Sequence, residues 1–230
     1  MRVVGRDGLP PVRCSWLGLR DYPAVWAAMK AHVEARTVAS DDEIWCLEHP
    51  PVYTLGAAGR REHVLAPGSI PVLPVDRGGQ VTYHGPGQLV VYALIDLKRR
   101  GLGIRELVSA LEMAVIGTVA GFGIEALARR DAPGVYVDGA KLASVGLRVR
   151  RHTSYHGLAV NVAMDLEPFS GINPCGYEGL AVTDLLTLGV RTTPRDLAAL
   201  LLPRLCAVAG FGEPSGVEAI EPVGVPAYGR

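Results

Sequence analysis

The part of the chain that says most about its fold is residues 134–149, which read GVYVDGAKLASVGLRV. The pair Asp138-Gly139 divides this stretch into two short runs, 134–137 and 141–149, that are rich in valine and other apolar residues. An Asp-Gly pair adopts positive φ easily, as the tight turn of a two-residue β-hairpin requires. The segment therefore predicts two antiparallel strands joined by a hairpin.

Outward from the hairpin, apolar residues at helical spacing predict three helices. The first covers 22–39 with Asp21 as its N-cap, and the second covers 104–119 and is closed by Gly121. The third begins at Pro194 after Thr193, and Pro203 is expected to kink or end it. Further strands are expected at 44–48, 52–55, 70–75, 89–97 and 157–164. Helices that interleave with hairpin-linked strands favour an α+β fold, a mixed β-sheet domain flanked by helices, over a doubly wound parallel sheet.

The whole-chain composition is that of a soluble globular protein. A length of 230 residues suits one domain over 1–212, followed by a Pro/Gly-rich tail over 213–230 that packs on the surface. Lys and Arg number 23, as do Asp and Glu, so no net charge draws the chain to nucleic acid or an anionic membrane. No apolar run is long enough to span a bilayer, and residues 1–13 lack the apolar core of a signal peptide. We expect a reduced, cytoplasmic protein and, without a repeat or coiled coil, a monomer.

One cysteine stands in a setting that suits a nucleophile. Cys175 has Pro174 before it and Gly176 after it, which breaks regular structure and favours a bent loop. A thiol in such a loop is accessible and firmly aimed. The other three cysteines, Cys14, Cys46 and Cys206, lie in apolar, periodic contexts and are expected to be inert. None of the four shows metal or disulfide spacing.

Lys141 is a candidate partner for this cysteine. It follows the hairpin turn on a strand of otherwise small or apolar residues, where a lysine is either a solvated edge residue or a cation that faces a pocket. A free thiol is only a few per cent thiolate at neutral pH, and a nearby ammonium raises that fraction. Lys141 and Cys175 are 34 positions apart, so their meeting is a hypothesis at this point.

The segment from Arg77 to Gln88, RGGQVTYHGPGQ, is too polar and glycine-rich for core. Its glycines allow backbone to approach a ligand closely, although a long turn between two strands is the alternative reading. It matches neither a P-loop nor a dinucleotide fingerprint. His84 in this segment and His156 are competing partners for the cysteine, as in a cysteine hydrolase, with a structural role favoured for His156. No carboxylate pair or metal-ligand cluster stands out.

Several separate motifs together resemble one family. They are His49-Pro50 with Val52-Tyr53-Thr54-Leu55-Gly56, the 77–88 loop, 135–149 with Lys141, Tyr155-His156-Gly157-Leu158-Ala159, and Ile172-Asn173-Pro174-Cys175-Gly176-Tyr177. The chain resembles the octanoyltransferases of lipoate biosynthesis, the lipoyl(octanoyl) transferase family (LipB), from about residue 49 to residue 186.

The resemblance implies a mechanism and a set of binding residues. Cys175 takes the octanoyl group from octanoyl-acyl carrier protein as a thioester, Lys141 handles protons, and a lysine of an apo lipoyl domain receives the acyl group as an amide. It also implies the α+β catalytic domain of lipoate and biotin protein ligases over 1–212, with no cofactor and no metal. The implied acceptors are the lipoyl domains of 2-oxoacid dehydrogenase complexes and the glycine cleavage H protein. The acyl-binding residues carried over are Arg77, Gly78, Gly79, Gln80, Val81, Thr82, Tyr83, His84, Ser144, Val145, Gly146, Gly157, Leu158 and Ala159.

Elementary energetics agree with such a transferase. Thioester exchange is nearly even and thioester to amide is downhill, so no nucleotide is needed. The small residues Gly146, Gly157 and Ala159 are expected to leave room for the acyl tail. A local positive patch for acidic partners could come from Lys98, Arg99, Arg100, Arg148, Arg150 and Arg151, or these could form an ordinary solvated surface.

Three positions depart from the family's usual residues. Ala93 stands where proline is common, Tyr136 where tryptophan is frequent, and Asp184 where serine is common, and we interpret all three as tuning of the site. The alternatives to a transferase are an ATP-dependent lipoate or biotin protein ligase, a cysteine-type thioester hydrolase that uses His84, and a non-enzymatic acyl-carrier binding module.

Overall fold

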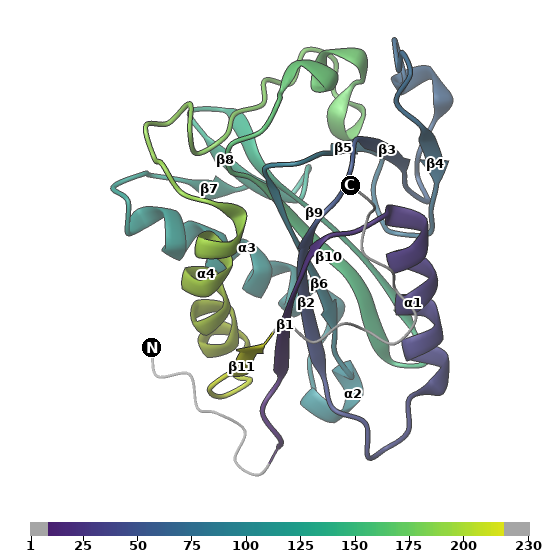
Figure 1. Ribbon diagram of the computed structural model, residues 1–230, viewed down its shortest axis with the longest axis vertical. Coiled ribbons are helices and arrows are strands. Elements are labelled where there is room, and N and C mark those ends of the chain that lie inside the picture. Colours follow the sequence, from purple (N-terminus) through teal and green to yellow (C-terminus); the bar gives the residue numbers. More distant parts are fainter. Residues whose placement is uncertain (1–8, 219–230) are drawn as a thin grey trace.

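Two β-sheets and four α-helices make up the fold of the computed structural model, which describes residues 9–218 (Figure 1). The larger sheet has eight strands in the order β11-β1-β2-β6-β10-β9-β8-β7, and the smaller has three in the order β4-β3-β5. Parallel pairing of β1 with β2 and antiparallel pairing of β2, β6, β10 and β9 make the large sheet mixed. The strands are β1 Arg13–Leu19, β2 Glu43–Glu48, β3 Val52–Leu55, β4 Val72–Pro74, β5 Val81–His84, β6 Gln88–Leu94, β7 Leu127–Ala128, β8 Gly134–Val137, β9 Ala140–Arg150, β10 Thr153–Asn161 and β11 Ser215–Glu218.

Helices cover both faces of the large sheet (Figure 1). Helices α3 (Ile104–Ala120) and α4 (Pro194–Ala209) pack on one face, and α1 (Tyr22–Ala35) packs on the other. Successive residues of β6 alternate between the two cores: Val91 and Ala93 belong to the α3/α4 side, Val90 and Tyr92 to the α1 side. This period of two is what a strand covered on both faces requires.

The predicted hairpin is present in β8 and β9. Val137 pairs with Ala140, and the two turn residues Asp138 and Gly139 have φ of 48° and 82°, the left-handed values expected of this pair. The short strands β2 and β3 also lie where the sequence predicts them, within one residue at each end. Local turn chemistry was therefore a sufficient guide in this part of the chain.

Several predicted boundaries were wrong. Helix α1 ends at Ala35 rather than residue 39, and Asp21 occupies its N-cap without a side-chain hydrogen bond. The strand expected at 89–97 ends at Leu94, because Asp96 caps the short helix α2 (Leu97–Arg100). The strand expected at 157–164 is shifted to Thr153–Asn161, and that expected at 70–75 is only Val72–Pro74.

Helix α4 runs through Pro203, where the sequence predicted a kink or an end. Proline removes an N–H and leaves the carbonyl of Ala199 without its helical partner, at a cost of about 3 kcal/mol. Both residues lie on the exposed face, where water can satisfy that carbonyl. Leu201, Leu202 and Leu205 are fully buried on the opposite face, so packing holds the helix together.

The region expected to be a surface tail contributes a strand. β11 pairs in parallel with β1 at the edge of the large sheet. The rest of that region, 219–230, and the first eight residues considered for a signal peptide lie outside the described residues, so the division at 212 stays a prediction. None of the helices between residues 9 and 218 combines the length and the apolar character that crossing a bilayer demands.

Candidate active site

Cys175 lies in a sharply bent segment, η3 (Pro174–Gly176). Its φ of 57° is left-handed, as is the φ of 81° at Gly176. The Asn173 N–H donates to the His63 carbonyl at 2.9 Å, which ties the segment to another part of the chain, and the Gly176 N–H donates to the Asn173 carbonyl at 2.9 Å, which closes the turn. The thiol is half-buried. The proline and glycine that flag this loop in the sequence thus hold the thiol in one position at the surface of the fold.

Lys141 reaches this thiol from the second residue of β9. Its side chain is 1% exposed, and its Nζ lies 3.0 Å from Cys175 Sγ. The same Nζ donates to the Pro133 carbonyl at 3.1 Å and to the Tyr136 hydroxyl at 2.9 Å. The structure therefore brings together the two residues that sequence spacing could not connect, and it surrounds the lysine with acceptors, as a buried cation requires.

A pocket opens beside the cysteine between β5, β6, β9, β10 and the start of α1. Twelve of the fourteen predicted binding residues line it: Arg77, Gly79, Gln80, Val81, Thr82, His84, Ser144, Val145, Gly146, Gly157, Leu158 and Ala159. Gly78 does not line it. Its N–H donates to the Leu147 carbonyl at 2.9 Å, so this residue pairs with the backbone of β9. Tyr83 does not either, because strand alternation turns its ring into a separate core with Tyr53 and Phe169.

Four further lining residues were missed as binding residues: Tyr22, Val90, Tyr92 and His156. Tyr22 comes from the first turn of α1, and Val90 and Tyr92 come from the continuously apolar β6. Nothing in their local sequence separates pocket wall from core. The pairing of β6 with β10 places Val90 and Tyr92 beside Ala159 and Gly157 at the site, and the packing of α1 on the same face of the sheet adds Tyr22.

The glycines in the pocket wall have a different purpose from the one expected. A Cβ at position 157 would overlap the carbonyl oxygen of Val91, and one at 146 would stand 2.8 Å from the carbonyl oxygen of Gly78. Backbone thus fills the space beside both glycines. They permit close approach of neighbouring segments rather than leave room for an acyl tail.

The buried Arg77 side chain holds the 77–80 turn in place through hydrogen bonds to backbone carbonyls. Its guanidinium donates to the Thr54 carbonyl at 2.6 Å, the Gln80 carbonyl at 2.8 Å and the Gly78 carbonyl at 2.9 Å. Burial lowers its pKa, with no carboxylate among the groups that oppose this effect. A third of the segment that looked irregular, Val81–His84, is the strand β5, and Arg77 ties the turn before this strand to β3.

Neither candidate histidine is hydrogen-bonded to Cys175. His84 contacts the Gln88 carboxamide oxygen through Nδ1 at 2.7 Å, and burial holds its pKa well below the usual value. His156 contacts Asp76 through Nε2 at 2.9 Å, which is the hydrogen-bonded structural role favoured from sequence, although the residue also lines the pocket. Among residues 9–218, lysine is therefore the side-chain partner of this thiol, which argues against a Cys/His hydrolase.

The remaining cysteines are fully buried. Burial raises the pKa of Cys46 to about 12, and a hydrogen bond with Cys206 together with burial raises the pKa of Cys14 still further. Those two thiols are therefore protonated at neutral pH and shielded from reagents.

The three unusual positions have separate roles. Ala93 is buried in the α3/α4 core and does not line the pocket. Asp184 accepts from the N–H groups of Met164 and Thr187, at 3.2 and 2.8 Å, and so holds a turn. Tyr136 alone touches the site, through Lys141.

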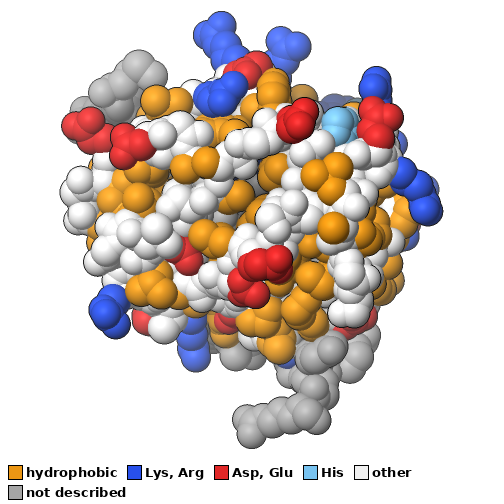
Figure 2. Space-filling model, turned by 90° about the horizontal axis from the view of Figure 1, so that it is seen from above, with side chains coloured by type: hydrophobic (Ala, Val, Ile, Leu, Met, Phe, Trp, Pro, Cys, Tyr) orange, Lys and Arg blue, Asp and Glu red, His pale blue; other side chains and the backbone are white. Residues whose placement is uncertain are grey.

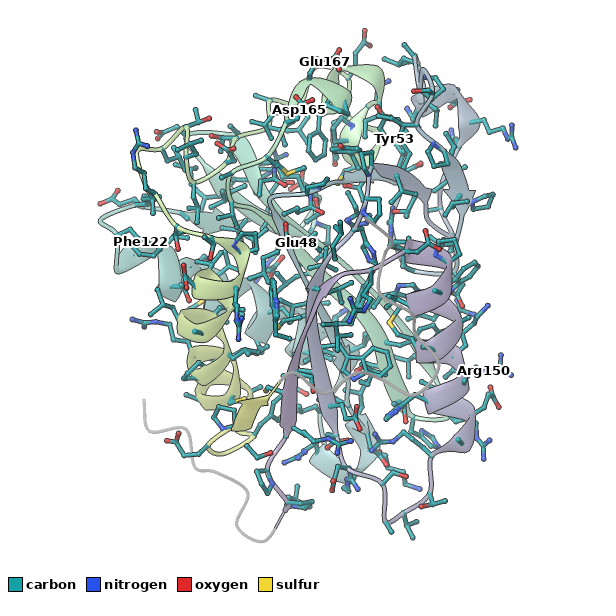
Figure 3. The ribbon with its side chains drawn as sticks, in the orientation of Figure 1. Glu48, Tyr53, Phe122, Arg150, Asp165 and Glu167 are labelled. Carbon is teal, nitrogen blue, oxygen red and sulfur yellow. The ribbon has the colours of Figure 1, made fainter. Side chains whose placement is uncertain are left out.

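The basic residues considered for a patch are partly neutralised. Arg99 and Arg100 are bound to Asp42 at 2.8 and 2.7 Å, and Arg150 is bound to Glu34 at 2.6 Å. Figure 3 shows Asp165 and Glu167 at the top of the molecule and Arg150 well below them, at the right-hand side. Figure 2, which looks down on that upper end, shows apolar side chains over much of the face and Lys and Arg mainly at its rim.

Fold and site together define an α+β domain whose pocket carries a cysteine–lysine pair. The family described as lipoyl protein ligase A/B catalytic domain matches residues 21–204, and the chain belongs to this family. A relative named octanoyltransferase, from Alkalilimnicola ehrlichii, is 60% identical over 205 residues, which cover 89% of this chain and 95% of the relative.

Solved structures show the same fold at low sequence identity. A bi-partite lipoate protein ligase from Thermoplasma acidophilum has a TM-score of 0.67 at 14% identity and covers 87% of this chain and 84% of its own. A biotin protein ligase from Aquifex aeolicus, in complex with biotin and ATP, has a TM-score of 0.55 at 13% identity, with 86% and 70% covered. The resemblance to octanoyltransferases and the predicted fold class are both confirmed.

Proposed function

We propose that this chain is a lipoyl(octanoyl) transferase that moves an octanoyl group from octanoyl-acyl carrier protein to a lysine of apo lipoyl domains, the first step of protein lipoylation. The observation that carries the proposal is the 3.0 Å contact between Lys141 Nζ and Cys175 Sγ at the mouth of a pocket. The octanoyltransferase name of a 60% identical relative supports the acyl group and the reaction type.

The first half-reaction is attack of the Cys175 thiolate on the donor thioester. A new C–S bond forms to Cys175, the bond to the carrier sulfur breaks, and the Lys141 ammonium gives its proton to the departing thiolate. The products are an octanoyl-enzyme thioester, a free carrier thiol and a neutral Lys141 amine. Because Lys141 Nζ lies 3.0 Å from Cys175 Sγ, its proton is close to the carrier sulfur when that sulfur leaves the carbon under attack by Cys175.

The second half-reaction returns the enzyme to its starting state. The neutral lysine amine of the lipoyl domain attacks the octanoyl thioester, and the C–S bond to Cys175 breaks as the amide forms. The proton lost by the attacking nitrogen goes to Lys141, and Cys175 leaves as the thiolate. Each proton given in the first step is thus recovered in the second, and no nucleotide is consumed.

The pocket wall suits an apolar tail. Val90 and Ala159, whose side chains lie on the α1 side of the large sheet, supply apolar side chains to this wall together with the ring of Tyr92. An octanoyl tail has about six methylenes, and at about 0.8 kcal/mol each their burial contributes roughly 5 kcal/mol. That contribution is enough to select a medium-length acyl chain over acetyl.

The acceptors we propose are the lipoyl domains of 2-oxoacid dehydrogenase complexes and the glycine cleavage H protein. We further propose that the enzyme acts as a cytoplasmic monomer. The donor protein, the acceptors and the assembly state are tested separately from the chemistry, by transfer assays with each purified domain and by light scattering.

The decisive experiment is the intact mass of the protein after mixing with octanoyl-acyl carrier protein without an acceptor. We expect the wild type to gain one octanoyl group and to lose it when apo lipoyl domain is added. Cys175→Ala should gain none, while Cys46→Ala, which removes a fully buried thiol, should behave as wild type.

Other outcomes separate the alternatives. Transfer by Cys175→Ala would mean direct attack by the acceptor amine or, if ATP is required, a ligase. Release of free octanoate at the same rate with and without acceptor would identify a thioester hydrolase.

A further inference from the structure

We propose that Tyr136 is a positioning residue for proton transfer: with the Pro133 carbonyl it fixes two of the three N–H directions of Lys141, so that the third always points to Cys175. This inference rests on the proposed function, because it concerns the proton that Lys141 gives and recovers. The three distances from Nζ are 2.9 Å to Tyr136, 3.1 Å to Pro133 and 3.0 Å to Cys175 Sγ.

The direction of the hydrogen bonds follows from counting protons. Tyr136 has one hydroxyl proton, and the hydroxyl donates to the Ala132 carbonyl at 2.8 Å. Its oxygen therefore presents only lone pairs to Lys141 and must accept. Burial raises the pKa of Tyr136, so the phenol keeps this proton at neutral pH. Pro133 can only accept as well, because its group at the site is a carbonyl.

The fold builds this arrangement around one irregularity in β8. The register with β9 shifts between Val135 and Tyr136. The Gly134 N–H donates to the buried Glu112 carboxylate of α3 at 2.8 Å. A Cβ at Gly134 would overlap the Ala143 carbonyl and stand 3.0 Å from Lys141 Nζ, so the turn must lie close to the lysine. Glu112 thereby fixes the segment that carries the Pro133 carbonyl.

Charged groups approach the lysine and the tyrosine from several elements. Glu112 comes from α3 and acts on Lys141 electrostatically, and Cys175 comes from η3. The Arg129 guanidinium, just after β7, lies 5.1 Å from the centre of the Tyr136 ring. Arg129 is itself bound to Asp131 at 2.6 Å, which offsets its charge. Arg77 acts electrostatically on Cys175 from the opposite wall.

Two fixed acceptors suit both charge states of the lysine. As an ammonium, Lys141 donates to Tyr136, to Pro133 and to the thiolate. As a neutral amine, it still donates to Tyr136 and Pro133, and its lone pair is left pointing at the sulfur and at whatever proton departs or arrives there. The lysine can therefore release and recover a proton without rotating, in line with its two half-reactions.

The test is the rate of Cys175 alkylation by iodoacetamide as a function of pH, read by peptide mass on intact folded protein. Tyr136→Phe removes the acceptor and keeps the ring. We expect the rate at pH 7 to fall about tenfold and the midpoint of the pH profile to rise by about one unit, which is the same fold-change expressed on the pH axis. Tyr136→Trp offers a donor toward Ala132 but no acceptor to Lys141, and it should give the same loss.

The matched control is Tyr136→Phe in a Lys141→Ala background. If the tyrosine acts through the lysine, the second change has no further effect on the alkylation profile. A further tenfold loss there would assign the effect to packing and overturn the inference. An alkylation profile like that of the wild type in either the Tyr136→Phe or the Tyr136→Trp single variant would also overturn the inference. If Tyr136→Phe does not fold, Tyr136→Trp takes its place in the test.

The same data distinguish failure of the proposed function. A wild-type midpoint near that of a free thiol, unaffected by Lys141→Ala, would contradict the cysteine–lysine pair itself. A low wild-type midpoint that rises in Lys141→Ala but not in either Tyr136 variant would leave the pair intact and contradict only the role of Tyr136.

Discussion

In the mechanism that we propose, the chemistry of the site depends on Lys141, a lysine buried beside the thiol. Its side chain is 1% exposed, and the acceptors around it include the sulfur of Cys175. A buried cation is tolerated only where such partners compensate for lost hydration. The same contacts that keep the ammonium in the fold therefore keep it beside the thiol.

Lys141→Ala should reduce single-turnover octanoyl transfer by about 10²- to 10⁴-fold, the usual contribution of a positioned proton-transfer group. The rate of acyl-enzyme formation, measured by mass after rapid quenching, checks this expectation. Lys98→Ala removes an exposed lysine of α2 and should leave the rate unchanged. A loss below about threefold in Lys141→Ala would contradict the role we propose.

Buried histidines link the stability of the fold to pH. His49 is fully buried, with Nδ1 donating to the Arg20 carbonyl at 2.6 Å and Nε2 accepting from the Tyr92 hydroxyl at 2.8 Å. Burial lowers its pKa to about 4. Above the unfolded value of about 6.5 the ring is neutral in both states, so stability is complete there. As pH falls from 6.5 towards 4 the unfolded chain binds the proton first, and up to about 3 kcal/mol is lost.

The Tm should accordingly fall between pH 7 and pH 5, and His49→Gln should flatten this part of the curve while lowering the Tm at pH 7. His152→Asn, a change at an exposed position, is the control and should leave the slope as in wild type. An identical slope in His49→Gln would show that other groups set the acid sensitivity. His84, whose pKa burial also depresses, would be the next to test.

At the scale of the secondary-structure elements, β10 and β6 approach so closely at Gly157 that there is no space for a side chain there. Gly157 pairs with Tyr92 on one side and Gly146 on the other. Because its Cα faces the Val91 carbonyl, an added methyl group has to push the strands apart. Both strands supply the pocket wall, so this strain also reaches the site.

Gly157→Ala should cost about 3 kcal/mol of unfolding free energy, the upper end of the usual range for overpacked buried sites. Chemical denaturation measures the change. Gly139→Ala lies in the exposed hairpin turn with no atom within 4 Å, so only its φ of +82° opposes the methyl group and about 1 kcal/mol is expected. Equal costs for the two variants would contradict the close approach that we describe.

For the molecule as a whole, charge is balanced and much of the local positive charge is paired. The chain has 23 basic and 23 acidic residues, and Arg99, Arg100 and Arg150 are bound to carboxylates. If the donor is the acidic carrier protein that we propose, its encounter with this chain has little long-range electrostatic help.

We expect kcat/KM for octanoyl-acyl carrier protein to change less than about threefold between 50 and 300 mM NaCl, because screening acts mainly on long-range steering. A steady-state assay at constant pH checks this. A tenfold fall would instead show that other arginines form a steering surface, and Arg60→Ala and Arg129→Ala would locate it.

Sequence alone predicted much of this fold because turns and helical periodicity are local. The hairpin at Asp138-Gly139 and the helix over 104–119 needed no distant information. Strands β1, β5, β7 and β11 were missed: β7 has only two residues, and the other three pair with strands that are distant in the sequence. Similarly, Cys175 could be recognised by its loop, whereas its contact with Lys141 and the place of Tyr22 in the pocket arise only when the sheet assembles.

The parallel pairing of β1 with β11 has a consequence for synthesis. Arg13 lies opposite Ser215, so the β1 edge of the large sheet cannot be completed until β11, some two hundred residues later in the chain, has been synthesised. Until the ribosome has released that strand, the backbone of β1 offers unpaired N–H and C=O groups to any neighbouring nascent chain. We expect this interval to be when the protein is most prone to aggregate and most dependent on chaperones.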